Sequence, residues 1–94
     1  MTLAFPNSSR SFDEARNAVR FSGYDGMFEV PFFVESGALT KSGRKELSEA
    51  ESLTAFDAAR SSIHDVARKA YSRGRKNLFV LTSADFRHQA SHRL

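Results

Sequence analysis

The dipeptide Asp25-Gly26 stands between two runs of alternating apolar residues, and it constrains the fold more than any other feature of the sequence. Glycine takes the positive φ of a tight turn without steric cost, so this pattern predicts a β-hairpin. We expect strands at 17–23 and 28–35, joined by a four-residue loop from Tyr24 to Met27. This loop would place Phe21 opposite Val30.

The alternation along both strands divides the hairpin into two sides, because successive side chains of a strand point to opposite faces. Proline has no N–H group to donate, so Pro31 predicts an edge position for residues 28–35. The predicted core side carries six apolar residues: Val19, Phe21, Phe28, Val30, Phe32 and Val34.

One long amphipathic helix is predicted from about residue 44 to 73, with Ser48 to Glu51 in a capping-box pattern. Its acidic residues lie early and its basic residues late, which suits the helix dipole, and Gly74 is a natural stop. Its apolar stripe recurs at spacings of three and four: Leu53, Phe56, Ala59, Ile63, Val66, Ala67 and Ala70.

Shorter elements complete the predicted α+β fold, in which a small, mainly antiparallel sheet packs one face on the long helix. The sheet comprises the hairpin 17–23/28–35 and a strand at 78–82, and short helices begin at Ser36 and near Thr82. Ser11 to Glu14 predicts either one helical turn or a polar loop.

The length of 94 residues predicts a single domain, 1–94, with a loose N-terminal segment 1–10 and a frayed tail 89–94. There are no cysteines, which excludes disulfides, thiolate zinc sites and thiol catalysis. No apolar run is long enough for a transmembrane helix, so we expect no membrane partner. The N-terminus lacks an early positive charge and a signal-length apolar stretch, which predicts a cytoplasmic protein.

Three segments carry a family resemblance: the hairpin with Val19-Arg20-Phe21, the helix from Ala55 to Tyr71, and the closing stretch from Leu81 to Phe86. Together they resemble the bacterial domain-of-unknown-function 1488 family, over about residues 5–86. The resemblance implies a short bacterial cytosolic protein with an α+β fold. It implies no activity, cofactor or catalytic residue.

Basic residues gather around the end of the long helix, with no acidic residue between Asp65 and Asp85. Such a cluster either meets nucleic-acid phosphates or is a solvated helix end whose cations suit the dipole. We favour the second interpretation, because 14 Lys and Arg against 11 Asp and Glu leave a net charge of only +3. The candidate anion or nucleic-acid contacts are Arg68, Arg73, Arg75 and Lys76.

Pro31 and Phe33 are candidate interface residues, since Phe33 points away from the predicted core side. The strand 78–82 also offers apolar residues to both faces, whereas one long helix covers only one face of the sheet. The second face needs a cover, and two alternatives supply it. One is the N-terminal segment with its apolar residues Leu3, Phe5 and Phe12, which we favour because isolated exposed apolar residues are normal, and the other is a second copy in a symmetric dimer.

No group of residues predicts catalysis, a cofactor or a metal site. His64 has the character of a boundary residue on the helix flank, with Asp57 as a candidate partner. His88 and His92 share a metal-ligand spacing but lack the further ligands that zinc needs. Phosphate-loop and serine-nucleophile motifs are absent from the sequence. We predict a non-enzymatic interaction or accessory module, with weak nucleic-acid binding through residues 68–76 as the alternative.

Overall fold

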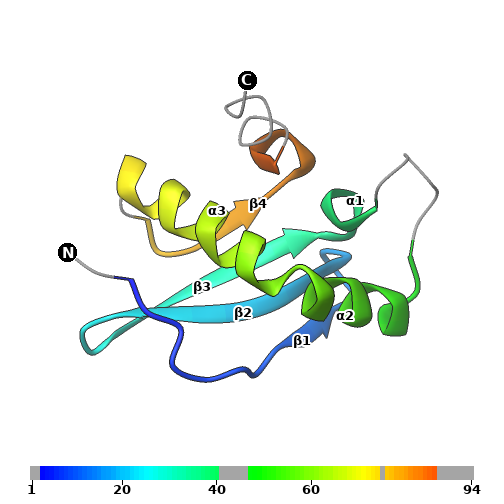
Figure 1. Ribbon diagram of the computed structural model, residues 1–94, viewed down its shortest axis with the longest axis horizontal. Helices are drawn as coiled ribbons and strands as arrows, with labels where there is room; N and C mark the ends of the chain where they lie inside the picture. Colours follow the sequence, from blue (N-terminus) through cyan, green and yellow to red (C-terminus); the bar gives the residue numbers. More distant parts are fainter. Residues whose placement is uncertain (1–2, 41–46, 75, 87–94) are drawn as a thin grey trace.

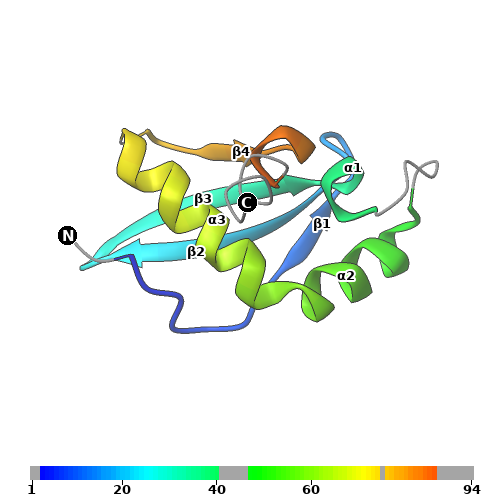
Figure 2. The same cartoon turned by 45° about the horizontal axis from the view of Figure 1, so that its top comes forward.

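A four-stranded sheet backed by helices on one side forms the molecule (Figures 1 and 2). The structure is a computed structural model, and it describes residues 3–40, 47–74 and 76–86. Its strands are β1 (Ser11–Asp13), β2 (Ala18–Asp25), β3 (Phe28–Glu35) and β4 (Phe79–Leu81), in the spatial order β1-β2-β3-β4. Its labelled helices are α1 (Ser36–Leu39), α2 (Glu49–Ala58) and α3 (Arg60–Arg73), and a further helical turn at residues 83–86 agrees with the short helix predicted near Thr82.

The predicted α+β class is confirmed, and the sheet is mostly antiparallel. Strands β1, β2 and β3 pair antiparallel, whereas β4 runs parallel to β3. The chain between β3 and β4 passes through α1, α2 and α3, as a crossover between parallel strands requires. No helix in the described parts of the chain is long and apolar enough to cross a membrane.

The β2–β3 hairpin turns at Gly26 and Met27, so the predicted four-residue loop is wrong. Asp25 pairs with Phe28, and Phe21 therefore lies opposite Phe32 instead of Val30. Gly26 has a φ of 65°, which suits glycine at the first position of a two-residue hairpin turn. The pairing moves by two residues, and such a shift leaves every side chain on its predicted face.

Pro31 lies in an interior strand, because β3 is paired on both sides, and the predicted edge position is wrong. It faces Ser22, and counting from the two-residue turn makes this pair non-hydrogen-bonded. On the other side, pairing with β4 begins only at Phe32, opposite Phe79. Neither neighbouring strand needs the N–H group that proline lacks.

The long helix predicted over 44–73 is two helices, α2 and α3, that meet at Ala59. This residue leaves the helical conformation, at φ −112° and ψ 18°, and its N–H donates to the carbonyls of both Ala55 and Phe56. The two helices lie over different parts of the sheet. Helix α2 lies close to β1 and β2, whereas α3 lies close to β4 and also reaches β2 through His64 and Tyr71. The predicted capping box is present at Ser48 and Glu51, and residues 44–46 lie outside the described parts.

The core lies between the sheet and the helices and is dominated by aromatic rings. The Phe32 ring lies at its centre, with the centroid of Phe21 at 5.3 Å and that of Phe79 at 5.0 Å. Of the six residues on the predicted core side, five are buried and Phe28 is 78% exposed, because it directly follows the hairpin turn. The core cluster comprises Leu3, Val19, Phe21, Val30, Phe32, Val34, Phe56, Ile63, Val66, Ala67, Tyr71, Phe79 and Leu81.

The N-terminal segment from Leu3 to Arg10 is attached at both of its ends, in contrast to the loose segment 1–10 that the sequence predicts. Ala4 and Tyr24 exchange two backbone hydrogen bonds of 2.8 Å, and Leu3 is buried in the core. At the other end, the Arg10 guanidinium donates two hydrogen bonds to Asp57, of 3.0 and 2.7 Å. Bidentate arginine–carboxylate pairs fix geometry well, so this contact ties the segment to α2.

Strand β1 replaces the helical turn or polar loop predicted at Ser11 to Glu14. Its residue Phe12 pairs with Val19 of β2 and packs against the core cluster from the helix side. Strand pairing buries this ring, which a polar loop would leave in water. Asn17, in the turn that follows, takes a φ of 52°, a conformation that asparagine tolerates better than most residues. The predicted tail 89–94 lies outside the described residues.

Gly23 gives a test of this packing, because a Cβ atom there would lie 2.8 Å from Phe5 Cε1 and 3.1 Å from Leu3 Cδ1. We expect Gly23→Ala to lower the free energy of unfolding by about 1–3 kcal/mol through overpacking. Chemical denaturation measures the change. Gly37→Ala is the matched control, since nothing lies within 4 Å of its added Cβ, and it should be neutral or slightly stabilising. Equal stability of the two variants would contradict the close approach.

Candidate functional site

The face of the sheet that points away from α2 and α3 is here termed the open face. Its residues alternate with those of the core, and the pairs Arg20–Phe33 and Phe33–Val80 connect it across three strands. Within the described residues, no helix lies over it (Figures 1 and 2). The open face comprises Ser11, Asp13, Ala18, Arg20, Ser22, Tyr24, Glu29, Pro31, Phe33, Glu35 and Val80.

The predicted interface residues Pro31 and Phe33 lie together on the open face, but Phe33 is only 7% exposed. The Arg16 guanidinium covers its ring, 4.5 Å from the centroid, which is the geometry of a cation–π contact. Val80 of the neighbouring strand is 40% exposed and Pro31 is partly buried. Pro31, Phe33 and Val80 thus form an apolar patch. Arg16 covers its Phe33 ring, and Val80 is its most exposed part.

The N-terminal segment does not cover the open face, contrary to one of the two predicted arrangements. The Phe5 ring contacts Phe21 and Phe32 on the helix side, with centroids 6.0 and 6.3 Å away. Leu3 and Phe12 also pack against the helix-side cluster. All three candidate covering residues therefore enlarge the main core and leave the open face as it is.

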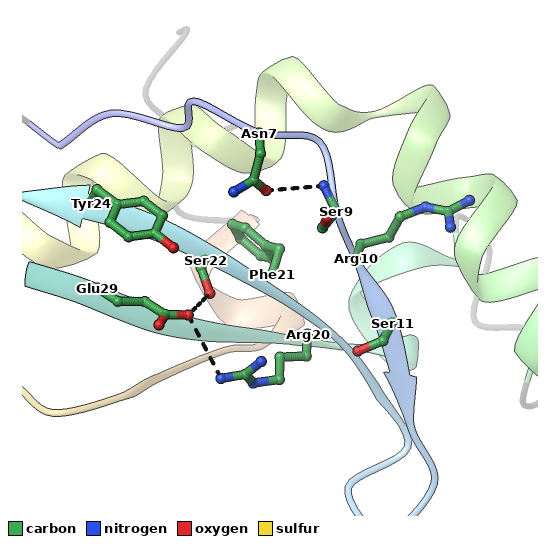
Figure 3. A pocket seen from close by; sticks show the side chains of 9 residues that line it. All are labelled: Asn7, Ser9, Arg10, Ser11, Arg20, Phe21, Ser22, Tyr24 and Glu29. Atoms are coloured by element: carbon green, nitrogen blue, oxygen red, sulfur yellow. Dashed lines mark hydrogen bonds and ion pairs between the residues drawn. The ribbon is translucent and has the colours of Figure 1, made fainter.

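A polar pocket of about 240 Å³ opens where the N-terminal segment separates from β2 (Figure 3). Ala4 pairs with Tyr24 and Ser11 pairs with Arg20, so the Ser22 backbone between them has no hydrogen-bond partner on this side among the described residues. This pocket, here termed the Ser22 pocket, is lined by Asn7, Ser9, Arg10, Ser11, Arg20, Phe21, Ser22, Tyr24 and Glu29.

The charged side chains of this pocket are already paired with one another or with α2. Glu29 accepts a hydrogen bond of 2.5 Å from the Ser22 hydroxyl and lies 4.0 Å from the Arg20 guanidinium. Arg10 is held by Asp57. Among the described pocket residues, the Glu29 carboxylate is the basic group in contact with the Ser22 hydroxyl, and no imidazole or amine lies beside it.

The structure divides the predicted basic cluster into separate sites. Arg68 donates to the Leu3 carbonyl at 3.3 Å, and its guanidinium lies 5.1 Å from the Phe5 ring centroid, so it fastens the N-terminal segment. Arg73 and Lys76 instead line a hollow beside β4. Arg75 lies outside the described residues. The four candidate anion contacts therefore do not share one surface.

His64 is partly buried and stacks on Phe5, with ring centroids 3.9 Å apart and an angle of 8° between the planes. Burial lowers the pKa of His64 below its ordinary value, and the positive charges of Arg60 and Arg68 lower it further. Its candidate partner Asp57 is engaged by Arg10 and Arg60 instead, and these hydrogen bonds lower the pKa of the Asp57 carboxyl.

The described residues contain no group of three or more histidine, cysteine or acidic side chains that could hold a metal ion. His88 and His92 lie outside the described parts of the chain.

Sequence reasoning missed two site residues, Arg16 and Ser22. Arg16 lies in the turn before β2, and nothing in its sequence neighbourhood indicates that it reaches Phe33 on β3. Ser22 matters because its backbone faces a gap in strand pairing, which depends on where the N-terminal segment rejoins the sheet. Only the tertiary arrangement reveals either of them.

Residues 3–81 match the family described as "Protein of unknown function (DUF1488)". The chain belongs to this family. The DUF1488 region extends from the buried Leu3 to the last residue of β4, so it includes the open face and the Ser22 pocket. Comparisons with curated proteins and with solved structures give no match.

His64 predicts how the stability of this DUF1488 protein depends on pH. Since the pKa of His64 is lowered in the folded state, the unfolded chain binds its proton first as the pH falls. The stabilising contribution is therefore complete above a pH of about 6.5 and decreases as the pH falls below it. We expect His64→Phe, which retains a ring against Phe5, to lose less stability than the wild type between pH of about 7.5 and 5.5.

Denaturation series at several pH values measure this difference, and NMR titration of the His64 imidazole measures its pKa directly. A midpoint at or above the ordinary histidine value would contradict the assignment, as would parallel pH profiles for the wild type and His64→Phe.

Proposed function

We propose that this DUF1488 protein is a non-enzymatic interaction module of the bacterial cytosol, and that its open face binds a second copy of the chain. The proposal rests on the location of the N-terminal apolar residues. Because Leu3 and Phe5 pack on the helix side, no described helix or segment covers the sheet residues Pro31, Phe33 and Val80, and the Arg16 side chain lies over the Phe33 ring. A patch of this kind is buried efficiently when two sheets meet face to face.

The charges on and beside this patch suit a second copy. Arg16 and Arg20 contribute positive charge there, and Asp13, Glu29 and Glu35 contribute negative charge. In a symmetric dimer the same surface meets itself, so an arginine of one copy can face a carboxylate of the other. A surface with both signs supports self-association better than association with a strongly charged partner.

Weak nucleic-acid binding through residues 68–76 is the weaker alternative. Arg68 already contacts the Leu3 carbonyl, Asp65 and the Phe5 ring, which removes it from a shared phosphate-binding surface. Within the described residues, two candidate contacts then remain, Arg73 and Lys76. Nucleic-acid binding of useful strength needs more neutralised phosphates than this.

Molecular mass in solution tests the proposal, using size-exclusion chromatography with light scattering at low and high salt. We expect the wild type to show twice the chain mass of 10.5 kDa at both salt concentrations. Val80→Asp should give a folded monomer, because it adds a charge to the exposed part of the patch. Val80 suits this test better than the buried Phe33, whose replacement by aspartate would also disturb the fold.

Met27→Asp is the matched control, since Met27 is 95% exposed at the hairpin turn and lies off the open face. It adds the same charge and should leave the mass unchanged. A wild-type monomer at every accessible concentration would overturn the proposal, and so would a Val80→Asp variant that remains a dimer.

A further inference from the structure

The outer edge of β4 is an unpaired strand edge in the described parts of the chain. β4 is the last strand in the sheet and pairs only with β3, through Phe32–Phe79, Phe33–Val80 and Val34–Leu81. An edge strand presents N–H and C=O groups that can pair with another extended chain. A three-residue edge accommodates a short segment.

A hollow of about 250 Å³ lies beside β4. All three β4 residues line it, although their side chains alternate between the two faces of the sheet, so the hollow follows the strand itself. The other side is formed by the end of α3, through Ala70, Arg73 and Gly74. The hollow therefore lies between β4 and the end of α3, and it is here termed the β4 groove.

The charge of the β4 groove is uneven along its length. Lys76 lies just before β4 and Arg73 ends α3, and both side chains are exposed. No described residue forms an ion pair with either of them. Asp85, which follows β4, is occupied locally, because its carboxylate accepts a hydrogen bond of 2.8 Å from the Thr82 N–H. The end of the groove where β4 begins thus carries two positive charges without an ion-pair partner among the described residues, and the Lys76 ammonium lies 5.8 Å from the Phe79 ring centroid.

We infer that the β4 groove binds an extended acidic peptide of a partner protein, added to the sheet antiparallel to β4. Antiparallel pairing places the C-terminal end of the peptide beside the start of β4, where Arg73 and Lys76 lie. Main-chain hydrogen bonds to the strand edge supply affinity, and carboxylates at that end of the peptide supply selectivity. An acidic peptide fits both features, whereas a nucleic acid offers phosphates but no strand to pair.

This inference is independent of the proposed dimer. Val80 contributes to both surfaces, and Lys76 also lines a second hollow together with Glu29 of the open face. Arg73 ends α3 and does not belong to the open face. Replacing Arg73 alone therefore tests the groove without removing a charge beside the dimer patch.

The test uses the full chain and the synthetic peptide acetyl-Thr-Val-Thr-Val-Asp-Glu with a free C-terminus, followed by two-dimensional ¹H–¹⁵N NMR. We expect the peptide to shift the amide signals of Phe79, Val80 and Leu81 and to bind in the high-micromolar to millimolar range. The double variant Arg73→Gln/Lys76→Gln should bind about five- to tenfold more weakly, as the loss of two exposed ion pairs predicts.

Lys69→Gln is the matched control for the single variants Arg73→Gln and Lys76→Gln, because it removes one positive charge from an exposed position outside the β4 groove. It should bind the peptide like the wild type. Thermal unfolding of the double variant and of Lys69→Gln checks that both remain folded, and the single variant Arg73→Gln should give an intermediate affinity. A reversed peptide, with its acidic residues at the N-terminal end, should bind more weakly than the original.

Several results would overturn the inference: no binding at millimolar peptide, shifts confined to other strands, or a weakening by Lys69→Gln as large as that by Arg73→Gln. Equal binding of the reversed peptide would also contradict it. An oligothymidylate that shifts the same amides and displaces the peptide would identify a phosphate site instead. If Arg73→Gln/Lys76→Gln alone converted a wild-type dimer to a monomer, a second copy would be the occupant of the groove.

Discussion

The two-residue turn at Gly26 and Met27 determines which side of each strand meets the helices. Side chains alternate along a strand, so a slip of one residue would exchange the core side of the hairpin for the open face. The turn places Phe21 opposite Phe32, and these stacked rings, with Phe56 and Phe79 against them, form the centre of the core. The open face consists of the intervening positions and depends on the same turn.

This alternation explains how much of the fold the sequence predicts. The hairpin strands and the faces of Val19 and Phe33 follow from periodicity alone, and a two-residue error in pairing leaves them unchanged. The bend at Ala59 has no sequence signal, because alanine is the most favourable helix residue. The bend lies between α2, which packs near β1 and β2, and α3, which extends to β4, so it depends on tertiary packing against the sheet.

The position of the N-terminal segment depends on contacts between residues far apart in the sequence. Leu3 and Phe5 are apolar, and both faces of the sheet carry apolar residues, so the sequence alone does not indicate on which face they pack. The absence of a side chain at Gly23 makes room for both of them on the helix side, and the Arg10–Asp57 pair holds the far end of the segment there. The N-terminal segment therefore covers the main core, and it leaves the open face without this cover.

Contacts between residues far apart in the sequence also separate the basic residues, which form one cluster in the sequence. On α3, Arg68 and Arg73 are five residues apart, which turns them by about 140° around the helix axis. Arg68 consequently meets Leu3 and Phe5, whereas Arg73 faces the side of β4. Because the Arg68 guanidinium is engaged in these contacts within the chain, it is less available to a ligand. Of the candidate anion contacts that the structure describes, Arg73 and Lys76 form no ion pair, and both lie beside an unpaired strand edge. This coincidence makes the β4 groove a more specific candidate than the basic cluster as a whole.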